Sequence, residues 1–247
     1  MSASEPDLAP LLRRHDRDRF LASLFAPAGR REALWALIAF NFEIARVRET
    51  VSQPLLGRIR LQWWREMLDE AYGDGAVRRH EVATPLAGAI RTWRIGRASL
   101  DAMIDGRERD LEEGPLADLA ALDAYAEATS GRLNEAMLDV LGVAGEPARI
   151  AARRVGIAWA IAGLIRAERY RPQPFLPPDG IGLVDSARRH LAAARALRRQ
   201  VPRAALPALL TAPLADAYLS RAGRPDAAAP DPLAALRLAW AKALGRY

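Results

Sequence analysis

Two apolar segments of the sequence end in charged side chains that could bind an anion or a metal ion. Residues 30–50 run through ALWALIAF before the charges begin, and residues 147–170 run through VGIAWAIAGLI. The polar and charged side chains at these two ends are Asn41, Glu43, Arg46, Arg48, Glu49, Arg166, Glu168, Arg169 and Arg171. Both segments are predicted to be central helices whose ends could build a polar patch at one end of a shared cavity, as in other helix bundles.

These charges have two interpretations. Glu43, Arg46 and Glu49 are spaced three residues apart, so they could form a ladder of ion pairs along one helix. Alternatively, the arginines could form an anion site without a metal, since guanidinium groups bind phosphate directly. The arginines of this second interpretation are Arg46, Arg48, Arg166, Arg169 and Arg171. The ladder is the simpler interpretation, because some of these arginines must face solvent.

The elements that position these residues are predicted to be helices throughout. Apolar residues recur every three or four positions, and no segment alternates as a strand would. The predicted helices are 16–26, 30–50, 54–72, 85–97, 99–112, 118–141, 147–170, 185–200, 203–211, 213–222 and 232–245. Gly142 and Gly223 are expected to end helices. We therefore predict one all-α domain over residues 16–247, preceded by an N-terminal tail over residues 1–15.

Composition argues against several kinds of metal site and indicates the cellular compartment. The 247 residues include no cysteine and three well-separated histidines, which argues against thiolate or histidine metal sites. The first ten residues, MSASEPDLAP, contain no apolar run of the kind found in a secretory signal. The longest apolar stretch, residues 155–165, is far shorter than the ~20 residues needed to cross a bilayer. We expect a cytoplasmic protein. The formal charge of +6 permits nucleic-acid binding, but no motif for it appears, so no nucleic-acid partner is expected.

Several segments together resemble the squalene/phytoene synthase family, from about residue 16 onward. They are REALWALIAF, LQWWREMLDEAYGDG, IDGRERDL, YAEATSGRL and GIAWAIAGLIR followed by FLP. The resemblance implies a single-domain helical bundle of the isoprenoid-synthase type with a central cavity. In that family, aspartate motifs on two central helices bind Mg²⁺, which neutralises the diphosphate that leaves the prenyl substrate.

At the two positions that match the aspartate motifs, this sequence has other residues. The first reads Ala45, Arg46, Val47, Arg48, Glu49, and the second reads Ala167, Glu168, Arg169, Tyr170, Arg171. Each motif has one carboxylate and two guanidinium groups, and like charges about 4 Å apart repel by roughly 4 kcal/mol at an effective dielectric constant of ~20. We therefore predict no metal site, no cofactor and no catalytic residue, in a chain that keeps the fold and has lost the reaction.

One branch of the family also lacks these aspartates, and its members assemble respiratory complex I, the NADH:quinone oxidoreductase. AFNFEIARVRETVSQPLLGRIRLQWWREML and IRAERYRPQPFLPPD resemble that branch. The resemblance implies a complex I subunit or an assembly intermediate as partner, with an anionic lipid or prenyl ligand in the cavity. The alternative is an active head-to-head prenyltransferase of isoprenoid biosynthesis, which would need Mg²⁺.

Two further groups of charged residues have a spacing that indicates how they are used. Residues 186–200 carry Arg188, Arg189, Arg195, Arg198 and Arg199 and no acid, so they form either a solvated face or a contact with an anionic membrane at its cytoplasmic side. The acids and arginines that alternate over residues 105–110 are predicted to form a solvated, salt-bridged face.

Overall fold

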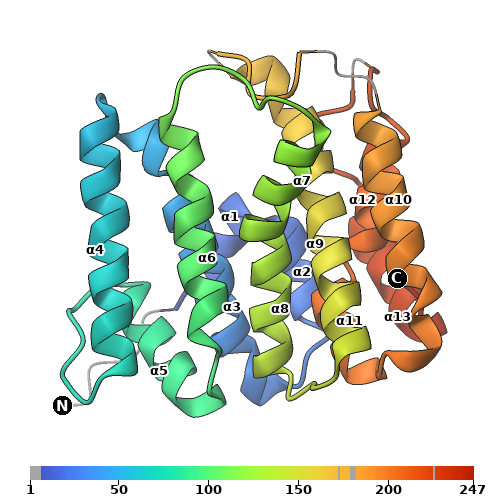
Figure 1. Ribbon diagram of the computed structural model, residues 1–247. Coiled ribbons are helices and arrows are strands. Elements are labelled where there is room, and N and C mark those ends of the chain that lie inside the picture. Colours follow the sequence, from blue (N-terminus) through green and yellow to red (C-terminus); the bar gives the residue numbers. More distant parts are fainter. Residues whose placement is uncertain (1–6, 172, 179–181, 225) are drawn as a thin grey trace.

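A computed structural model describes residues 7–171, 173–178, 182–224 and 226–247, and every regular element in this part of the chain is helical (Figure 1). The long helices run roughly parallel or antiparallel to one another, from α4 at one edge of the bundle to α10 and α13 at the other. The buried apolar residues form one continuous core. The predicted all-α, single-domain architecture is therefore confirmed.

The α-helices have the following bounds: α1 Ala9–His15, α2 Arg17–Ser23, α3 Ala28–Ala45, α4 Pro54–Tyr72, α5 Ala83–Trp93, α6 Arg97–Glu108, α7 Leu119–Ala126, α8 Arg132–Val140, α9 Glu146–Ala167, α10 Leu183–Ala196, α11 Leu206–Leu209, α12 Ala212–Leu219 and α13 Ala234–Leu244. Short 3-10 turns extend several of them: η1 Val47–Thr50, η2 Arg109–Leu111, η4 Glu168–Tyr170, η5 Arg198–Gln200 and η6 Arg203–Ala205. Gly142 and Gly223 both adopt positive φ after a helix, as the sequence predicted.

The two helices predicted to be central, α3 and α9, are buried on several faces. In α3 the side chains from Leu34 to Phe40 are almost all inaccessible, apart from Trp35. Helix α9 packs against α8, α10 and α12. A helix surrounded in this way needs apolar residues all round, which is what the sequence of both segments provides.

The predicted helix 118–141 is divided by a π-helical turn, η3, at Glu127–Gly131. Asp118 caps the N-terminus of α7, where its carboxylate accepts a hydrogen bond from the backbone N–H of Ala121 at 2.8 Å. Helix α9 crosses the π turn at Gly156 so closely that a Cβ there would lie 2.4 Å from the carbonyl oxygen of Ser130. The wide turn and the glycine together permit backbone contact between the two elements.

The predicted N-terminal tail, residues 1–15, differs from the structure in its second half. Residues 1–6 lie outside the described part of the chain, but Ala9–His15 form α1. The carboxylate of Asp7 accepts a hydrogen bond from the N–H of Ala9 at 2.9 Å, and the side chain of Leu12 is fully buried. Burial of Leu8 and Leu12 in the shared core stabilises a helix too short to form alone.

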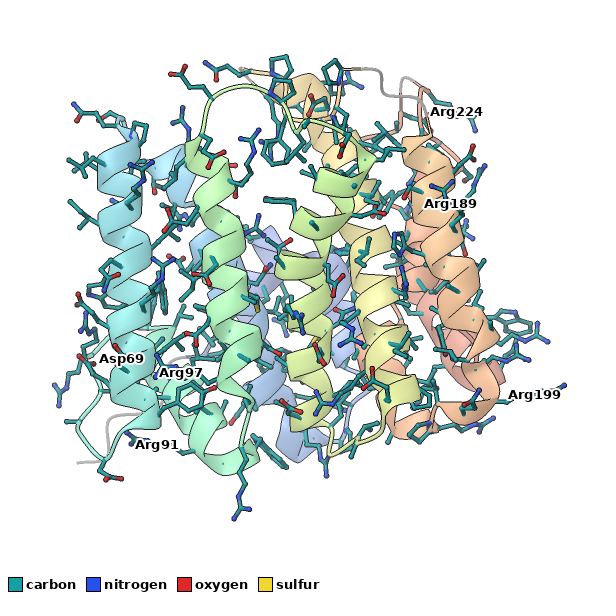
Figure 2. All side chains as sticks on the ribbon, in the orientation of Figure 1. Asp69, Arg91, Arg97, Arg189, Arg199 and Arg224 are labelled. Atoms are coloured by element: carbon teal, nitrogen blue, oxygen red, sulfur yellow. The ribbon has the colours of Figure 1, made fainter. Side chains whose placement is uncertain are left out.

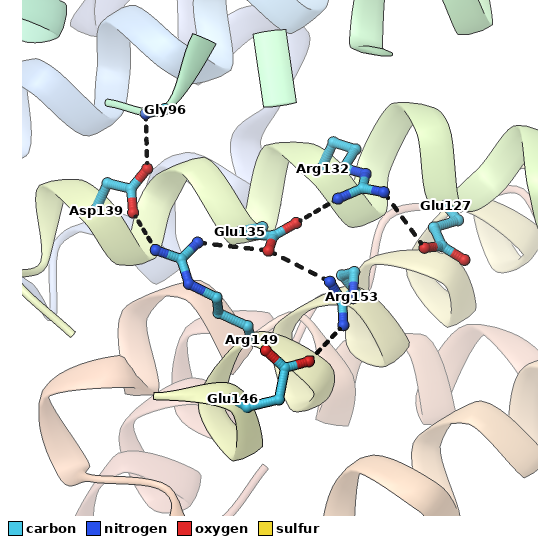
Figure 3. Close-up of polar contacts among 8 residues, drawn as sticks. All are labelled: Gly96, Glu127, Arg132, Glu135, Asp139, Glu146, Arg149 and Arg153. Carbon is cyan, nitrogen blue, oxygen red and sulfur yellow. Dashed lines mark hydrogen bonds and ion pairs between the residues drawn. The ribbon is translucent and has the colours of Figure 1, made fainter. Parts of the chain in front are cut away.

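Helices α8 and α9 are joined by a network of charges centred on the buried carboxylate of Glu135 (Figure 3). Its oxygens accept hydrogen bonds from Arg132 at 2.9 Å and from Arg149 and Arg153 at 3.4 Å each. Arg149 also contacts Asp139 at 2.8 Å, so each charge in the centre of the network has a partner. This network joins the N-terminal part of α9 to α8.

Candidate functional site

A cavity of about 690 Å³ lies between α3, the α6–α7 region and the upper half of α9. Its walls include small side chains and Trp159 from α9 and the aromatic rings of Tyr125 and Phe175. The rest of its lining comes from Arg48, Glu49 and Val51 at and after η1, from Glu112 and Gly114, and from Tyr170, Arg171 and residues 173–175; we call this end of the cavity its mouth. A concave site that joins an apolar wall to a few polar groups is the usual form of a small-molecule site.

Both positions that were matched to the aspartate motifs reach this cavity. From the first helix, Ala45, Arg48 and Glu49 line it, and from the second, Ala167 and Arg171 do so. Asn41, one turn below Ala45, lines it as well and is almost fully buried. The shared cavity expected from the sequence is therefore present in the structure.

Glu43 and Arg46, which were predicted as ligand-binding residues, lie outside this cavity. Their side chains pair at 3.3 Å and line a second, smaller pocket of about 270 Å³ with Trp63, Trp64 and His80. Successive helical residues differ by about 100° in direction, so residues 43 and 46 face away when 41, 45 and 48 face inward. The predicted ion-pair ladder is present only in its first half: Arg46 pairs with Glu43, whereas its link to Glu49 is a backbone hydrogen bond at 3.0 Å.

Three of the residues predicted at the end of the second central helix, Arg166, Glu168 and Arg169, also have other positions. The guanidinium of Arg166 lies 3.7 Å from the centre of the Tyr218 ring and donates to the carbonyl oxygen of Ala228 at 3.2 Å. Arg169 lies over the ring of Tyr170. The carboxylate of Glu168 accepts hydrogen bonds from the backbone N–H groups of Phe175 and Leu176 at 2.9 and 3.2 Å.

Glu168 therefore shapes the mouth of the cavity without lining it. Because its carboxylate holds the backbone at Phe175, that ring is kept against the cavity and under the guanidinium of Arg171, 4.3 Å from the ring centre. The prediction that Arg166 and Arg169 belong to the anion site is not supported by this geometry, because on α9 the cavity-lining positions are 159, 160, 163, 164 and 167.

A largely buried polar cluster in the cavity was not recognised as part of a site from the sequence. Arg107 donates to the hydroxyl of Tyr125 at 2.5 Å and pairs with Asp110 at 3.2 Å, and the Tyr125 hydroxyl donates to Asp110 at 2.8 Å. Burial raises the pKa of Tyr125 well above its usual value. The pKa of Arg107 is raised because Tyr125 and Asp110 outweigh the burial that would lower it. The three side chains are thus joined to one another by hydrogen bonds, and Arg107 also reaches the side-chain oxygen of Asn41 at 3.5 Å.

The expectation that residues 105–110 form a solvated face is therefore correct for one half of the helix surface and wrong for the other. Asp105 and Glu108 pair with Arg65 of α4 at 2.8 and 3.0 Å on the outside. Arg107 and Asp110 turn inward into the cavity. Alternation of charges alone contains no information about which side of the helix packs on the core.

Arg19 is a second buried cation, and it was not predicted as a site residue. One guanidinium nitrogen pairs with Asp16 at 2.9 Å, and another donates to the hydroxyl of Ser130 in the π turn at 2.5 Å. The guanidinium lies 5.5 Å from the centre of the Trp159 ring at the cavity wall. The only signal available was the three-residue spacing of Asp16 and Arg19.

The residues present do not fit a Mg²⁺ ion. Within the described ranges, no three histidine or acidic side chains are grouped as a metal site would require. Of the carboxylates that line the cavity, Asp110 is already bonded to Arg107 and Tyr125, and Glu49 shares the mouth with Arg48. A hard divalent cation needs several free oxygen ligands and is repelled by guanidinium groups.

The mouth is better suited to an anion. Arg48 and Arg171 both line it, and neither forms an ion pair with a carboxylate of the described residues. Deeper in the cavity, Arg19 and Arg107 are each balanced by an aspartate. The carboxylates of Glu49 and Glu112 line the same end, and Glu112 pairs with Arg109 at 3.5 Å. Two guanidinium groups without ion pairs among the described residues are thus available at the mouth, while the interior combines an apolar wall with a polar cluster whose charges are paired.

The arginines of α10 and η5, predicted to contact a membrane, are only partly available. Arg195 pairs with Asp216 and donates to the backbone carbonyl of Tyr247, so its guanidinium stabilises contacts within the bundle. Arg189 and Arg199 are exposed and project from this edge of the molecule (Figure 2). Among the described residues, no helix has the length and hydrophobicity to cross a membrane.

Comparison with known proteins provides independent information. The family model described as squalene/phytoene synthase matches residues 12–173. The mouse (Mus musculus) protein NADH dehydrogenase (ubiquinone) complex I, assembly factor 6, is 33% identical over 243 residues, which covers 87% of this chain and 73% of the mouse protein. The human (Homo sapiens) protein of the same name is 31% identical with the same coverage.

Two solved structures share the fold at low sequence identity. Squalene synthase HpnC from Alicyclobacillus acidocaldarius superposes with a TM-score of 0.70 at 16% identity, over 96% of this chain and 92% of that one. A dehydrosqualene synthase in complex with ligand gives a TM-score of 0.59, also at 16% identity, over 86% of this chain and 81% of that one. At such identity the likeness concerns the fold alone.

Proposed function

This chain belongs to the squalene/phytoene synthase family, and from that premise we propose that it is an assembly factor for respiratory complex I and not a prenyltransferase. The observation that carries the proposal is the likeness, over 87% of the chain, to proteins named complex I assembly factor 6. Its partner would be a complex I subunit or an assembly intermediate.

The cavity residues support a pseudoenzyme. A prenyltransferase of this family must neutralise the diphosphate leaving group, which is the task of Mg²⁺ bound by carboxylates. The matching positions that reach the cavity are Ala45, Arg48, Glu49, Ala167 and Arg171, which together carry one carboxylate and two guanidinium groups. We infer that the chain does not ionise prenyl diphosphates.

The same residues favour a role in binding an anionic lipid or prenyl ligand. Arg48 and Arg171 would contact a phosphate at the mouth, and the wall that includes Trp159 and Phe175 would contact the hydrocarbon part. A protein that assembles a membrane-bound enzyme works beside the membrane, so the proposal places this chain in the cytoplasm, at the inner face of the membrane.

The assembly role is tested by deleting the gene and separating the membranes on a native gel stained for NADH dehydrogenase activity. The deletion should reduce fully assembled complex I, and the wild-type gene should restore it. Normal amounts of assembled enzyme in the deletion strain would contradict the proposal. Release of pyrophosphate from farnesyl diphosphate with Mg²⁺ would instead establish the alternative, an active prenyltransferase.

Ligand binding is tested separately by calorimetric titration of the purified protein with farnesyl diphosphate or phosphatidylglycerol, without Mg²⁺. Arg48→Glu with Arg171→Glu should weaken binding at least tenfold, because two attractive charges at the mouth become repulsive. Arg46→Glu is the matched control, since its side chain is on the same helix and outside the cavity. Absence of heat with the wild-type protein would refute the ligand and leave the assembly role standing.

A further inference from the structure

The outward face of α13 is apolar along its whole length. Leu233, Leu236, Trp240 and Leu244 are 52%, 64%, 68% and 45% exposed. Their spacing of three, four and four residues places them in one row, which we call the α13 stripe. The opposite face of the helix, with Ala234, Leu238 and Ala241, is buried against the bundle.

Such a helix is unusual at the surface of an isolated domain. A helix at a protein–water boundary normally has one apolar face and one polar face, and a helix that is apolar all round is normally buried. Single exposed leucines are common, but a continuous apolar row marks a surface that another phase or molecule covers. Ala239 and Ala243, which precede Trp240 and Leu244 in the helix, are also apolar and exposed.

The border of the α13 stripe is cationic. From Pro232 to Tyr247 the sequence has no acidic residue, and its cations are Arg237, Lys242 and Arg246. Arg237 pairs with Asp231 at 2.7 Å. Lys242 and Arg246 form no ion pair with the carboxylates of residues that the structure describes.

Arginines from neighbouring elements add to this border. The guanidinium of Arg203 lies so near the end of α13 that a Cβ on Gly245 would be 3.1 Å from it. Arg198 is close enough to act electrostatically on Tyr247. Arg199 projects from the same edge of the bundle as α13 (Figure 2). An apolar row that contains a tryptophan and has cations only at its sides is typical of helices that lie in the interface of an anionic membrane.

We propose that the α13 stripe inserts into the surface of an anionic lipid membrane, with the cations at its border placed at the level of the lipid phosphates. A membrane contact of this chain rests on the proposed function. The α13 stripe would add apolar side chains to that contact, which the arginines of α10 alone do not provide. The stripe is also separate from the ligand cavity, since no residue of α13 lines that cavity.

Charge favours a membrane over a second copy of this chain. Two copies packed stripe to stripe would bring Lys242 and Arg246 of each protomer toward the same cations of the other, and neither helix has an acid to offset them. Anionic headgroups offset all of these charges at once, and each cation near such a surface adds to the affinity.

The test is flotation of the purified protein with vesicles of phosphatidylethanolamine and phosphatidylglycerol, compared with phosphatidylcholine vesicles. The wild-type protein should bind the anionic vesicles, and Leu236→Glu with Trp240→Glu should reduce the bound fraction at least tenfold. Leu55→Glu with Ile59→Glu is the matched control: these residues are similarly exposed, at 61% and 57%, on α4 at the opposite edge of the bundle, and their substitution should change nothing.

The proposal would be overturned if the wild-type protein did not bind anionic vesicles, or if the α13 variant bound them as well as the wild-type protein. It would also be overturned if the α4 variant lost as much binding as the α13 variant. A concentration-dependent dimer in sedimentation equilibrium that Trp240→Glu abolishes would assign the stripe to a second copy. Circular dichroism and thermal unfolding of each variant establish that the fold is intact. Because the assay contains only protein and lipid, its outcome is independent of the complex I role.

Discussion

Gly156 is the position where a single methyl group should have the largest measurable effect on the framework of the cavity. A Cβ there would lie 2.4 Å from the carbonyl oxygen of Ser130 and 2.6 Å from the Cα of Gly131, and both neighbours are backbone atoms that cannot rotate away. Overpacking of this kind typically costs 1–3 kcal/mol, roughly, and rigid neighbours favour the upper end of that range. Alanine returns about 1 kcal/mol through its higher helix propensity.

The expected net effect of Gly156→Ala is therefore a loss of about 2 kcal/mol in the free energy of unfolding. For a domain of this size, that corresponds to a melting temperature lower by roughly 4–8 °C. The same helix provides a matched control, because a Cβ on Gly163 would meet nothing within 4 Å. Gly163→Ala should raise the free energy of unfolding by about 0.5–1 kcal/mol.

Thermal and urea unfolding of the two variants beside the wild-type protein provide the measurement. Opposite signs for the two variants are expected, with a difference of about 3 kcal/mol between them. If Gly156→Ala is as stable as the wild-type protein, the backbone contact between α9 and the π turn is not as described. Equal destabilisation in both variants would show that the effect belongs to α9 as a helix and not to this contact.

Three other substitutions test separate parts of the structure. Glu135→Gln removes the charge shared by three arginines and should lower stability by about 1–2 kcal/mol in urea unfolding. The loss is smaller than for a fully buried pair, because those arginines are partly solvated and each has a second carboxylate. No change would mean that the network is not a stabilising contact. Burial raises the pKa of Tyr218 to about 12, so the native state retains a proton that the unfolded chain loses near pH ~10, and stability present below that pH is lost as the pH rises toward 12. Tyr218→Phe should flatten this alkaline decline in stability, and an identical pH profile would refute the assignment. Glu168→Ala leaves two backbone N–H groups without their acceptor and should accelerate limited proteolysis of the segment after α9. Glu168→Gln keeps an acceptor oxygen and should have an intermediate effect. Equal cleavage of the wild-type protein and both variants would contradict the role given to Glu168.

The sequence was sufficient for most of the helical framework. Helix α4 has the predicted bounds, Pro54–Tyr72, because proline at its first position and glycine after its last mark both ends chemically. Glycines 142 and 223 adopt the positive φ that their positions suggested. The first half of the N-terminal prediction lies outside the described residues, and α1 was missed because a seven-residue helix has too little internal periodicity to be recognised.

The cavity was predictable in part. Because α3 and α9 are apolar on nearly every side, their sequences show that both are central and that both become polar at one end. The same property hides which way each helix faces, since a helix without a polar side has no preferred orientation that periodicity can reveal. Hence Arg48 and Arg171 reach the cavity as predicted, whereas Arg46 and Arg166 do not.

The sequence by itself determined the helical class, the family and the presence of arginines at the ends of two central helices. Only the tertiary structure decided which of those arginines line the cavity, that Arg107 and Arg19 line it with them, and that the α13 stripe is exposed. The physical reason is that hydrogen bonds and side-chain propensities within a helix are local, whereas the direction of a side chain depends on neighbours far away in the sequence. Arg19 and Ser130, which are 111 residues apart, meet only after the bundle has closed.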